Sequence, residues 1–252
     1  SLTLNRSFHS ALTPWLAGSP VRAGSRAEGR SFLFTHRLDY DTDKSEIECY
    51  LDVLRAVEPD VPTDPSLELW LTDAECLQAA QRLRVAFDVD LDRIRLLGLQ
   101  PGASNLSKQW DSARFAQTAD ALLAAHPNVR LFLLGGAEER ATADAMLALM
   151  EPENRRRAAN FVGELDLRAS LAMVSQADVF LGNDTALRHS AVALHIPSIA
   201  LFGPTNPRKW GNYGSPHRNL VSDDGTMAGI EVADVIGAVD ALLTSSAGVC
   251  AV

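Results

Sequence analysis

The chain has few cysteines and no long apolar run, and each absence excludes a class of protein. The cysteines are Cys49, Cys76 and Cys250, an odd number at wide spacings, so the patterns typical of zinc sites and redox pairs are excluded. We therefore expect reduced thiols in a cytoplasm-like compartment. No apolar stretch approaches the roughly 20 residues of a membrane span. Segment 11–18 is short, is broken by Pro14 and follows no basic leader, so we expect no signal peptide.

Positive charge is also in deficit. The formal net charge of −9 argues against a general nucleic-acid surface or a surface for anionic membranes. With 46% hydrophobic and 22% charged residues, the chain has the balance of an ordinary globular protein. Its 252 residues accommodate one large domain or two modest ones.

Several well-known motifs are missing. The chain has no G-x-G-x-x-G fingerprint, no Walker lysine loop and no G-x-S-x-G elbow, so dinucleotide, P-loop and serine-hydrolase chemistry lose support. The acidic run 39–43 resembles the Asp-x-Asp motif of metal-dependent sugar transferases, but no strand precedes it. A solvated acidic loop is the better interpretation, and we expect neither a metal nor a cofactor.

What the chain does have is a regular alternation of strand and helix patterns from about residue 94. Such alternation predicts an α/β fold with a doubly wound parallel sheet. Right-handed crossovers then bring the carboxyl ends of all strands to one edge. The predicted strands are 95–99, 129–134, 160–163, 177–182 and 198–202. One predicted helix begins at Asp111 or Ser112, and the others span 141–150, 167–174, 190–195 and 232–243.

The first 92 residues are patterned less regularly. They contain a strand-like segment at 2–4 and helical segments at 7–16, 47–57 and from Thr72 or Asp73 to Phe87, with a proline-rich connection before the last. These are too few strands for an independent α/β domain. We therefore expect a partial α/β domain with its linker at 1–92 and a complete one at 93–252. The opening at Ser1, directly in a strand-like segment, is typical of a fragment that begins inside a domain.

The most informative segment follows the predicted strand 177–182. A strand end that feeds a helix start is where parallel sheets bind ligands, and a helix N-terminus attracts phosphate. Asp184, Thr185 and His189 place a carboxylate, a hydroxyl and an imidazole there. Thr185 and His189 are four residues apart and share one helix face. As plainer alternatives, Asp184 is only a helix cap, His189 is a packed core histidine, or Arg188 pairs with Asp184.

Three other strand ends also carry residues suited to ligands. Ser104 and Lys108 follow the first strand, and Lys108 is either a mobile cation at a site or a solvated surface lysine. Glycines 135 and 136 follow the second strand, and Glu138 just beyond could accept two ribose hydroxyls. Segment 203–207 follows the last strand and leads into Arg208 and Lys209. Trp110 and Trp210 nearby are more typical of cores than of stacking surfaces.

Together these segments resemble glycosyltransferase family nine, the bacterial ADP-heptose:lipopolysaccharide heptosyltransferases. The resemblance is strong from about residue 94 to 215 and weaker but recognisable over 5–24. The segments that carry it are Pro101-Gly102-Ala103-Ser104 with Lys108-Gln109-Trp110, Leu134-Gly135-Gly136, Gly182-Asn183-Asp184-Thr185, His189 and Phe202-Gly203-Pro204-Thr205-Asn206-Pro207.

The resemblance implies a GT-B architecture of two Rossmann-like domains. Residues 93–252 would be the nucleotide-sugar domain and residues 1–92 part of the acceptor-side domain. The implied donor-binding residues are Ser104, Lys108, Glu138, Asp184, Thr185, Ala186 and His189. Lys108 would meet the diphosphate or sugar, Asp184 the heptose hydroxyls, and Thr185 with the following amides the phosphates, supported by His189.

Two departures from the family's pattern matter. Ala186 stands where the family usually has glycine, and a positive φ there would strain an alanine. The strand and loop that carry the family's proposed general base would precede Ser1, so the catalytic base is not assigned to a residue of this chain. An inverting transfer needs such a base for the acceptor hydroxyl.

We therefore expect an inverting, metal-independent transfer of heptose from an ADP-sugar donor to a lipopolysaccharide core acceptor. A non-catalytic nucleotide-sugar-binding module, and another GT-B enzyme such as an epimerase, are the alternatives. No nucleic-acid partner is expected. The resemblance implies a cytoplasmic protein, with peripheral association at the inner face of the inner membrane. The incomplete sheet would leave unpaired edges, which favour aggregation or a homodimer.

Overall fold

The computed structural model describes residues 1–211 and 213–245, apart from the side chain of Glu28. It divides into two compact units, which are described separately. One comprises Ser1–Ser66 with Arg208–Asn212, and the other Leu67–Pro207 with Tyr213–Val252. Among the described residues, no helix combines the length and the apolar character that crossing a membrane requires.

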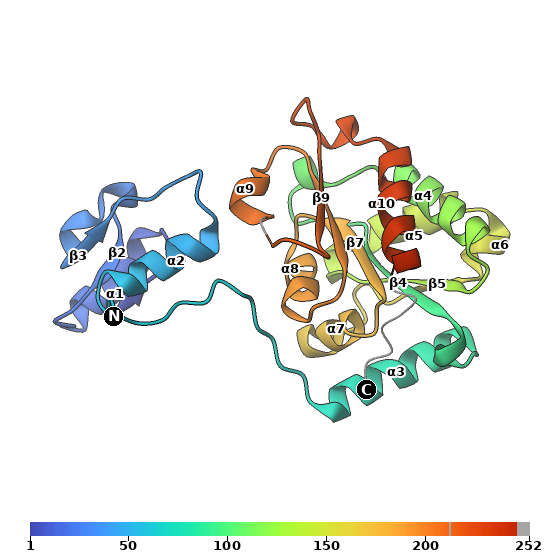
Figure 1. The fold of residues 1–252 in the computed structure, drawn as a ribbon, viewed down its shortest axis with the longest axis horizontal. Coiled ribbons are helices and arrows are strands. Elements are labelled where there is room, and N and C mark those ends of the chain that lie inside the picture. Colours follow the sequence, from blue (N-terminus) through green and yellow to red (C-terminus); the bar gives the residue numbers. More distant parts are fainter. Residues whose placement is uncertain (212, 246–252) are drawn as a thin grey trace. The chain divides into compact units, whose positions relative to one another are not determined.

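The larger unit is built on a six-stranded parallel sheet with the order β6-β5-β4-β7-β8-β9 (Figure 1). Leu97 pairs with Leu131 on one neighbouring strand and with Val179 on the other, so β4 and β7 lie at the centre. The strands are β4 (Arg95–Gln100), β5 (Val129–Leu133), β6 (Ala158–Asn160), β7 (Val179–Asn183), β8 (Ser198–Phe202) and β9 (Arg218–Val221).

Helices cover both faces of this sheet, as expected for a doubly wound fold. Because strand side chains alternate between faces, Leu97 and Leu99 belong to one core and Leu96 to the other. The first core includes residues of α4 (Ser112–Ala125), α5 (Arg140–Leu149) and α10 (Val232–Ser245). The second includes residues of α3 (Asp73–Phe87), α7 (Leu167–Val174) and α8 (Ala186–Ala193). A short helix, α6 (Pro152–Arg155), precedes β6.

Side-chain caps fix where the helices begin. Asp111 accepts a hydrogen bond from the amide of Ala113 at the start of α4. Thr72 and Glu75 form a reciprocal capping box at the start of α3, as the Thr72 interpretation predicts. These caps satisfy amides that have no partner within the helix.

The smaller unit holds a three-stranded parallel sheet, β1-β2-β3. Its strands are β1 (Leu2–Thr3), β2 (Ala23–Ser25) and β3 (His36–Leu38), and its helices α1 (Phe8–Leu16) and α2 (Glu46–Arg55). Its core cluster of buried residues is small and consists of Ala11, Leu33 and Phe34. Part of α9 (Pro207–Trp210) belongs to this unit.

Lys209 on α9 is buried within the smaller unit. Its Nζ lies 2.9 Å from both Glu46 Oε2 and the carbonyl oxygen of Asp41, and 3.9 Å from the centre of the Tyr40 ring. Lys209, which follows the strand end at 203–207 and was a candidate ligand residue, therefore serves the packing of the smaller unit. The acidic loop 39–43 serves the same contact through Asp41, and no group of metal-ligating side chains gathers among the residues that the structure describes.

The boundary between the units falls after Ser66, earlier than the expected division near residue 92. The physical reason is that α3 packs on α7 of the larger unit. Ala79 and Leu83 of α3 are buried in the same cluster as Leu171 and Met173 of α7. Helix α3 therefore completes one face of the larger sheet and is not part of a linker.

Candidate functional site

The end of β7 lies beside the end of β4, and Asn183 joins the two. Its side chain is fully buried. The amide nitrogen Nδ2 donates to the carbonyl oxygens of Pro101 (3.1 Å) and Gly102 (3.0 Å), while Oδ1 accepts from the backbone amide of Trp110 at 3.1 Å. These bonds hold the loop after β4 against the start of the segment that leads into α8. They explain how Lys108, in the same loop, reaches Asp184.

Lys108, Asp184 and His189 meet at this edge of the sheet. Lys108 Nζ lies 3.0 Å from Asp184 Oδ2, across 76 positions of sequence. His189 Nε2 lies 3.4 Å from the other carboxylate oxygen, Oδ1. The Asp184 side chain is 4% exposed and that of Lys108 is 30% exposed. Lys108 is thus not a solvated surface lysine, and Asp184 pairs with both Lys108 and His189.

The carboxyl group of Asp184 is held in its charged form. Burial on its own would raise the pKa of Asp184. Hydrogen bonds from His189 and Lys108 together outweigh that penalty and bring the pKa below its ordinary value. The site therefore presents a fixed carboxylate with an adjacent cation at neutral pH.

A pocket of about 330 Å³ opens beside this carboxylate. It is bounded by the ends of β4, β5 and β7 and by the start of α7. Of the predicted site residues, the following line it: Ser104, Glu138, Asp184, Thr185 and Ala186. Lys108 and His189 are not among its lining residues, but both contact Asp184, which is.

Two side chains that sequence reasoning did not select form a hydrogen-bonded floor for the pocket. Glu139 is buried and accepts from Gln100 Nε2 at 3.0 Å and from the amide of Gly136 at 2.9 Å. Gln100 Oε1 in turn accepts from the hydroxyl of Thr185 at 2.5 Å. A signal for Gln100 exists in the sequence, because it is a polar residue ending an apolar strand.

The glycines next to this floor leave space for Glu139. A Cβ atom on Gly102 would lie 2.6 Å from Glu139 Cβ, and one on Gly135 would lie 2.3 Å from Glu139 Oε2. Both distances are far below van der Waals contact. The glycines at two strand ends are thus required by a buried carboxylate. Glu138, the residue selected from the sequence, is exposed at the pocket.

The N-terminus of α8 faces the same pocket. Thr185 is its N-cap residue, but its hydroxyl is bonded to Gln100 and makes no cap bond. Ala186 and Leu187, the first two residues of α8, line the pocket. Ala186 does not adopt a positive φ, since Asp88 and His195 are the non-glycine residues that do so among those described. The expected strain at Ala186 is therefore absent, because this position is already helical.

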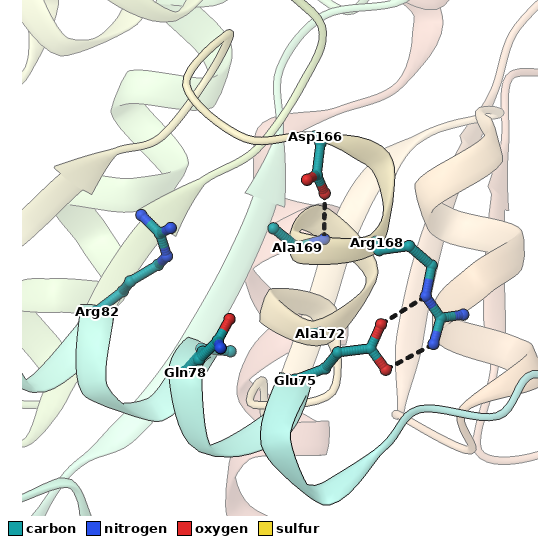
Figure 2. Close-up of a pocket in the computed structure, with 8 residues that line it drawn as sticks. Glu75, Gln78, Arg82, Asp166, Arg168, Ala169 and Ala172 are labelled. Carbon is teal, nitrogen blue, oxygen red and sulfur yellow. Dashed lines mark hydrogen bonds and ion pairs between the residues drawn. The ribbon is translucent and has the colours of Figure 1, made fainter.

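A second, smaller pocket of about 190 Å³ lies between α3 and α7 (Figure 2). There the two nitrogens Nε and Nη2 of Arg168 each lie 2.6 Å from an oxygen of Glu75. This pairing, together with hydrogen bonds from Thr72, lowers the pKa of Glu75 to about 2. Asp166 accepts from the amide of Ala169 and caps α7. The pairing of Glu75 on α3 with Arg168 on α7 joins the two helices at this pocket.

Comparison with known proteins identifies the family of the chain that carries this site. A model of glycosyltransferase family 9 (heptosyltransferase) matches residues 1–238. The chain belongs to this family. It is 30% identical over 214 residues to lipopolysaccharide heptosyltransferase 2 of Salmonella typhimurium, and 29% identical over 215 residues to that of Escherichia coli K12. Each match covers 81% of this chain and 59% of the relative. The chain thus spans about three fifths of the length of these relatives.

Solved structures show the same fold. The structure of E. coli ADP-heptose lipopolysaccharide heptosyltransferase II matches with a TM-score of 0.79 and 25% identity, covering 96% of this chain and 75% of that chain. A glycosyltransferase family 9 structure from Veillonella parvula DSM 2008 matches with a TM-score of 0.83 at 20% identity, covering 96% and 72%. The α/β architecture with parallel sheets is therefore that of the GT-B heptosyltransferases.

Proposed function

We propose that this chain carries the nucleotide-sugar site of a heptosyltransferase and binds ADP-heptose in the 330 Å³ pocket beside Asp184. The observation that carries the proposal is the meeting of Lys108, Asp184 and His189 at the N-terminus of α8. A charged carboxylate and a lysine at an uncapped helix start suit a ligand that has both hydroxyl groups and phosphates.

In this proposal each group has a distinct role. The amides of Ala186 and Leu187, with the positive end of α8, bind the diphosphate. Lys108 neutralises the charge that develops on the diphosphate as the sugar leaves, and Asp184 accepts hydrogen bonds from heptose hydroxyls. Glu138, exposed at the pocket, binds the ribose. Ser104, which also lines the pocket, contacts the donor.

The reaction would be an inverting transfer to the core of lipopolysaccharide, without a metal. In such a transfer the acceptor hydroxyl attacks the anomeric carbon, the bond to the diphosphate breaks, and a base takes the hydroxyl proton. Residues 1–66 form part of the acceptor side in this scheme, and the larger unit is the donor side. Peripheral association with the inner membrane remains a prediction from the family, and a homodimeric state remains a prediction from the unpaired sheet edges.

Calorimetric titration of the chain with ADP, ADP-heptose and UDP tests the donor assignment. We expect binding of both adenine nucleotides and at least about tenfold weaker binding of UDP, which corresponds to about 1.4 kcal/mol. Equal affinity for ADP and UDP would contradict the assignment. Turnover with a core acceptor distinguishes the enzyme from a module that binds the donor without catalysis.

A further inference from the structure

We propose that Tyr213 is a positioning residue whose hydroxyl orients the His189 ring toward Asp184. The inference rests on the proposed function, since Asp184 is the carboxylate that would meet the donor sugar. Tyr213 lies 24 positions after His189, between α9 and β9. Neither the sequence pattern nor the family resemblance selects it.

Two contacts fix the histidine ring against Tyr213. The tyrosine Oη lies 2.9 Å from His189 Nδ1. The ring centres are 5.8 Å apart with an angle of 78° between the planes, which is an edge-to-face contact. A hydrogen bond and an edge contact together restrict rotation of the imidazole about its last bond.

The hydrogen-bonding chemistry then determines which nitrogen of His189 carries the proton. Asp184 is charged, so its oxygens only accept hydrogen bonds. Its neighbour His189 Nε2 must therefore carry a proton. In a neutral imidazole the remaining nitrogen, Nδ1, is then an acceptor, and the hydroxyl of Tyr213 is placed to donate to it. Tyr213, His189, Asp184 and Lys108 thus form one connected series.

The tyrosine ring is itself in contact with a buried arginine. The guanidinium of Arg188, which is completely buried, lies 4.8 Å from the centre of the Tyr213 ring and donates to Asn219 Oδ1 at 2.7 Å. Burial, partly offset by Arg188, raises the pKa of Tyr213. The phenol therefore remains a hydrogen-bond donor at neutral pH. Phenylalanine at this position would keep the ring contacts and lose only the donor.

The test compares the parent chain with Tyr213→Phe by NMR of labelled histidine and by calorimetry with ADP-heptose. The parent His189 should show a protonated Nε2 and an unprotonated Nδ1 that accepts a hydrogen bond. Charged Asp184 still requires the proton on Nε2 in the variant, so the tautomer should be kept while the Nδ1 signal moves to the position of a nitrogen without a hydrogen bond. ADP-heptose affinity should fall about three- to tenfold, as expected for loss of one hydrogen bond. An unchanged Nδ1 signal or an unchanged affinity in the variant would overturn the inference.

A double-mutant cycle separates positioning from general packing. In a His189→Gln background, Tyr213→Phe should change ADP-heptose affinity by less than about twofold, because its effect acts through the imidazole. An equal loss in both backgrounds would overturn the inference. Tyr50→Phe, a matched change on α2 in the smaller unit, should leave affinity and the His189 signals unchanged. If the parent binds no ADP-heptose, the donor assignment fails, while the Nδ1 signal of His189 still decides whether Tyr213 holds the ring.

Discussion

Asp184 combines deep burial with a full negative charge, which is a costly state for a carboxyl group. Lys108 and His189 stabilise that charge from opposite sides, one on each carboxylate oxygen. Burial opposes the charge, and the two partners more than offset it. Such an arrangement is typical of a functional site, because a structural cap does not need a distant lysine.

Replacing Lys108 should weaken nucleotide binding. Lys108→Ala removes the cation beside Asp184, and we expect ADP affinity to fall at least about tenfold, because a hydrogen bond to a charged group contributes about 1.5–3 kcal/mol. Calorimetry measures the change. Lys44→Ala serves as the control, since Lys44 pairs with Asp52 in the smaller unit. Equal ADP affinity in the parent and Lys108→Ala would show that Lys108 does not contribute to nucleotide binding.

The charge of Asp184 should also make folding stability depend on pH. Its pKa in the folded chain lies below the ordinary value of 3.8, so its contribution is fully present above about pH 4 and is lost as the pH falls further. Urea unfolding of the parent at a series of pH values should therefore show a decline in stability below pH 4. Asp184→Asn should decline less steeply. Parallel pH curves for the two chains would contradict this account.

At the scale of elements, periodicity predicted most of the larger unit. The spans predicted for α7 and β8 agree with the structure, as does the start of α3 after Thr72. The predicted helix at 190–195 instead begins at Ala186. Strands β2, β3 and β9 were not predicted, because three or four residues are too few to establish a period of two.

The capping box of α3, the helix that contacts α7 in Figure 2, can be tested by mutation. Thr72→Ala removes one half of its capping box, and we expect a loss of about 1 kcal/mol in the free energy of unfolding. Urea denaturation measures it. Thr244→Ala, at the exposed end of α10 where the hydroxyl bonds only to helix carbonyls, should cost less than half as much. Equal losses in the two variants would show that the capping box contributes nothing specific.

The site was predictable where it depends on strand ends and unpredictable where it depends on side-chain partners. Asp184 and Lys108 follow neighbouring strands of a parallel sheet, so topology brings them to one edge. The partners of Gln100 and Glu139 depend on rotamers and on the space left by Gly102 and Gly135, which a single sequence does not reveal. The choice of Glu138 over its neighbour for the ribose remains a prediction.

At the scale of the whole molecule, the family membership and the pocket converge on one claim. The match to glycosyltransferase family 9 covers residues 1–238, and the pocket lies entirely within the larger unit. The larger unit begins at Leu67, before the first strand of its sheet, because α3 packs on α7 and belongs to this unit. We therefore expect the donor-side chemistry to be measurable on this chain by binding, independently of any acceptor.

A crystal structure of the chain with ADP tests that claim most directly. The account predicts that the diphosphate lies within hydrogen-bond distance of the amides of Ala186 and Leu187, with Lys108 Nζ in contact with a phosphate oxygen. A diphosphate bound elsewhere, for example beside Arg82 and Arg168 in the pocket between α3 and α7, would contradict it.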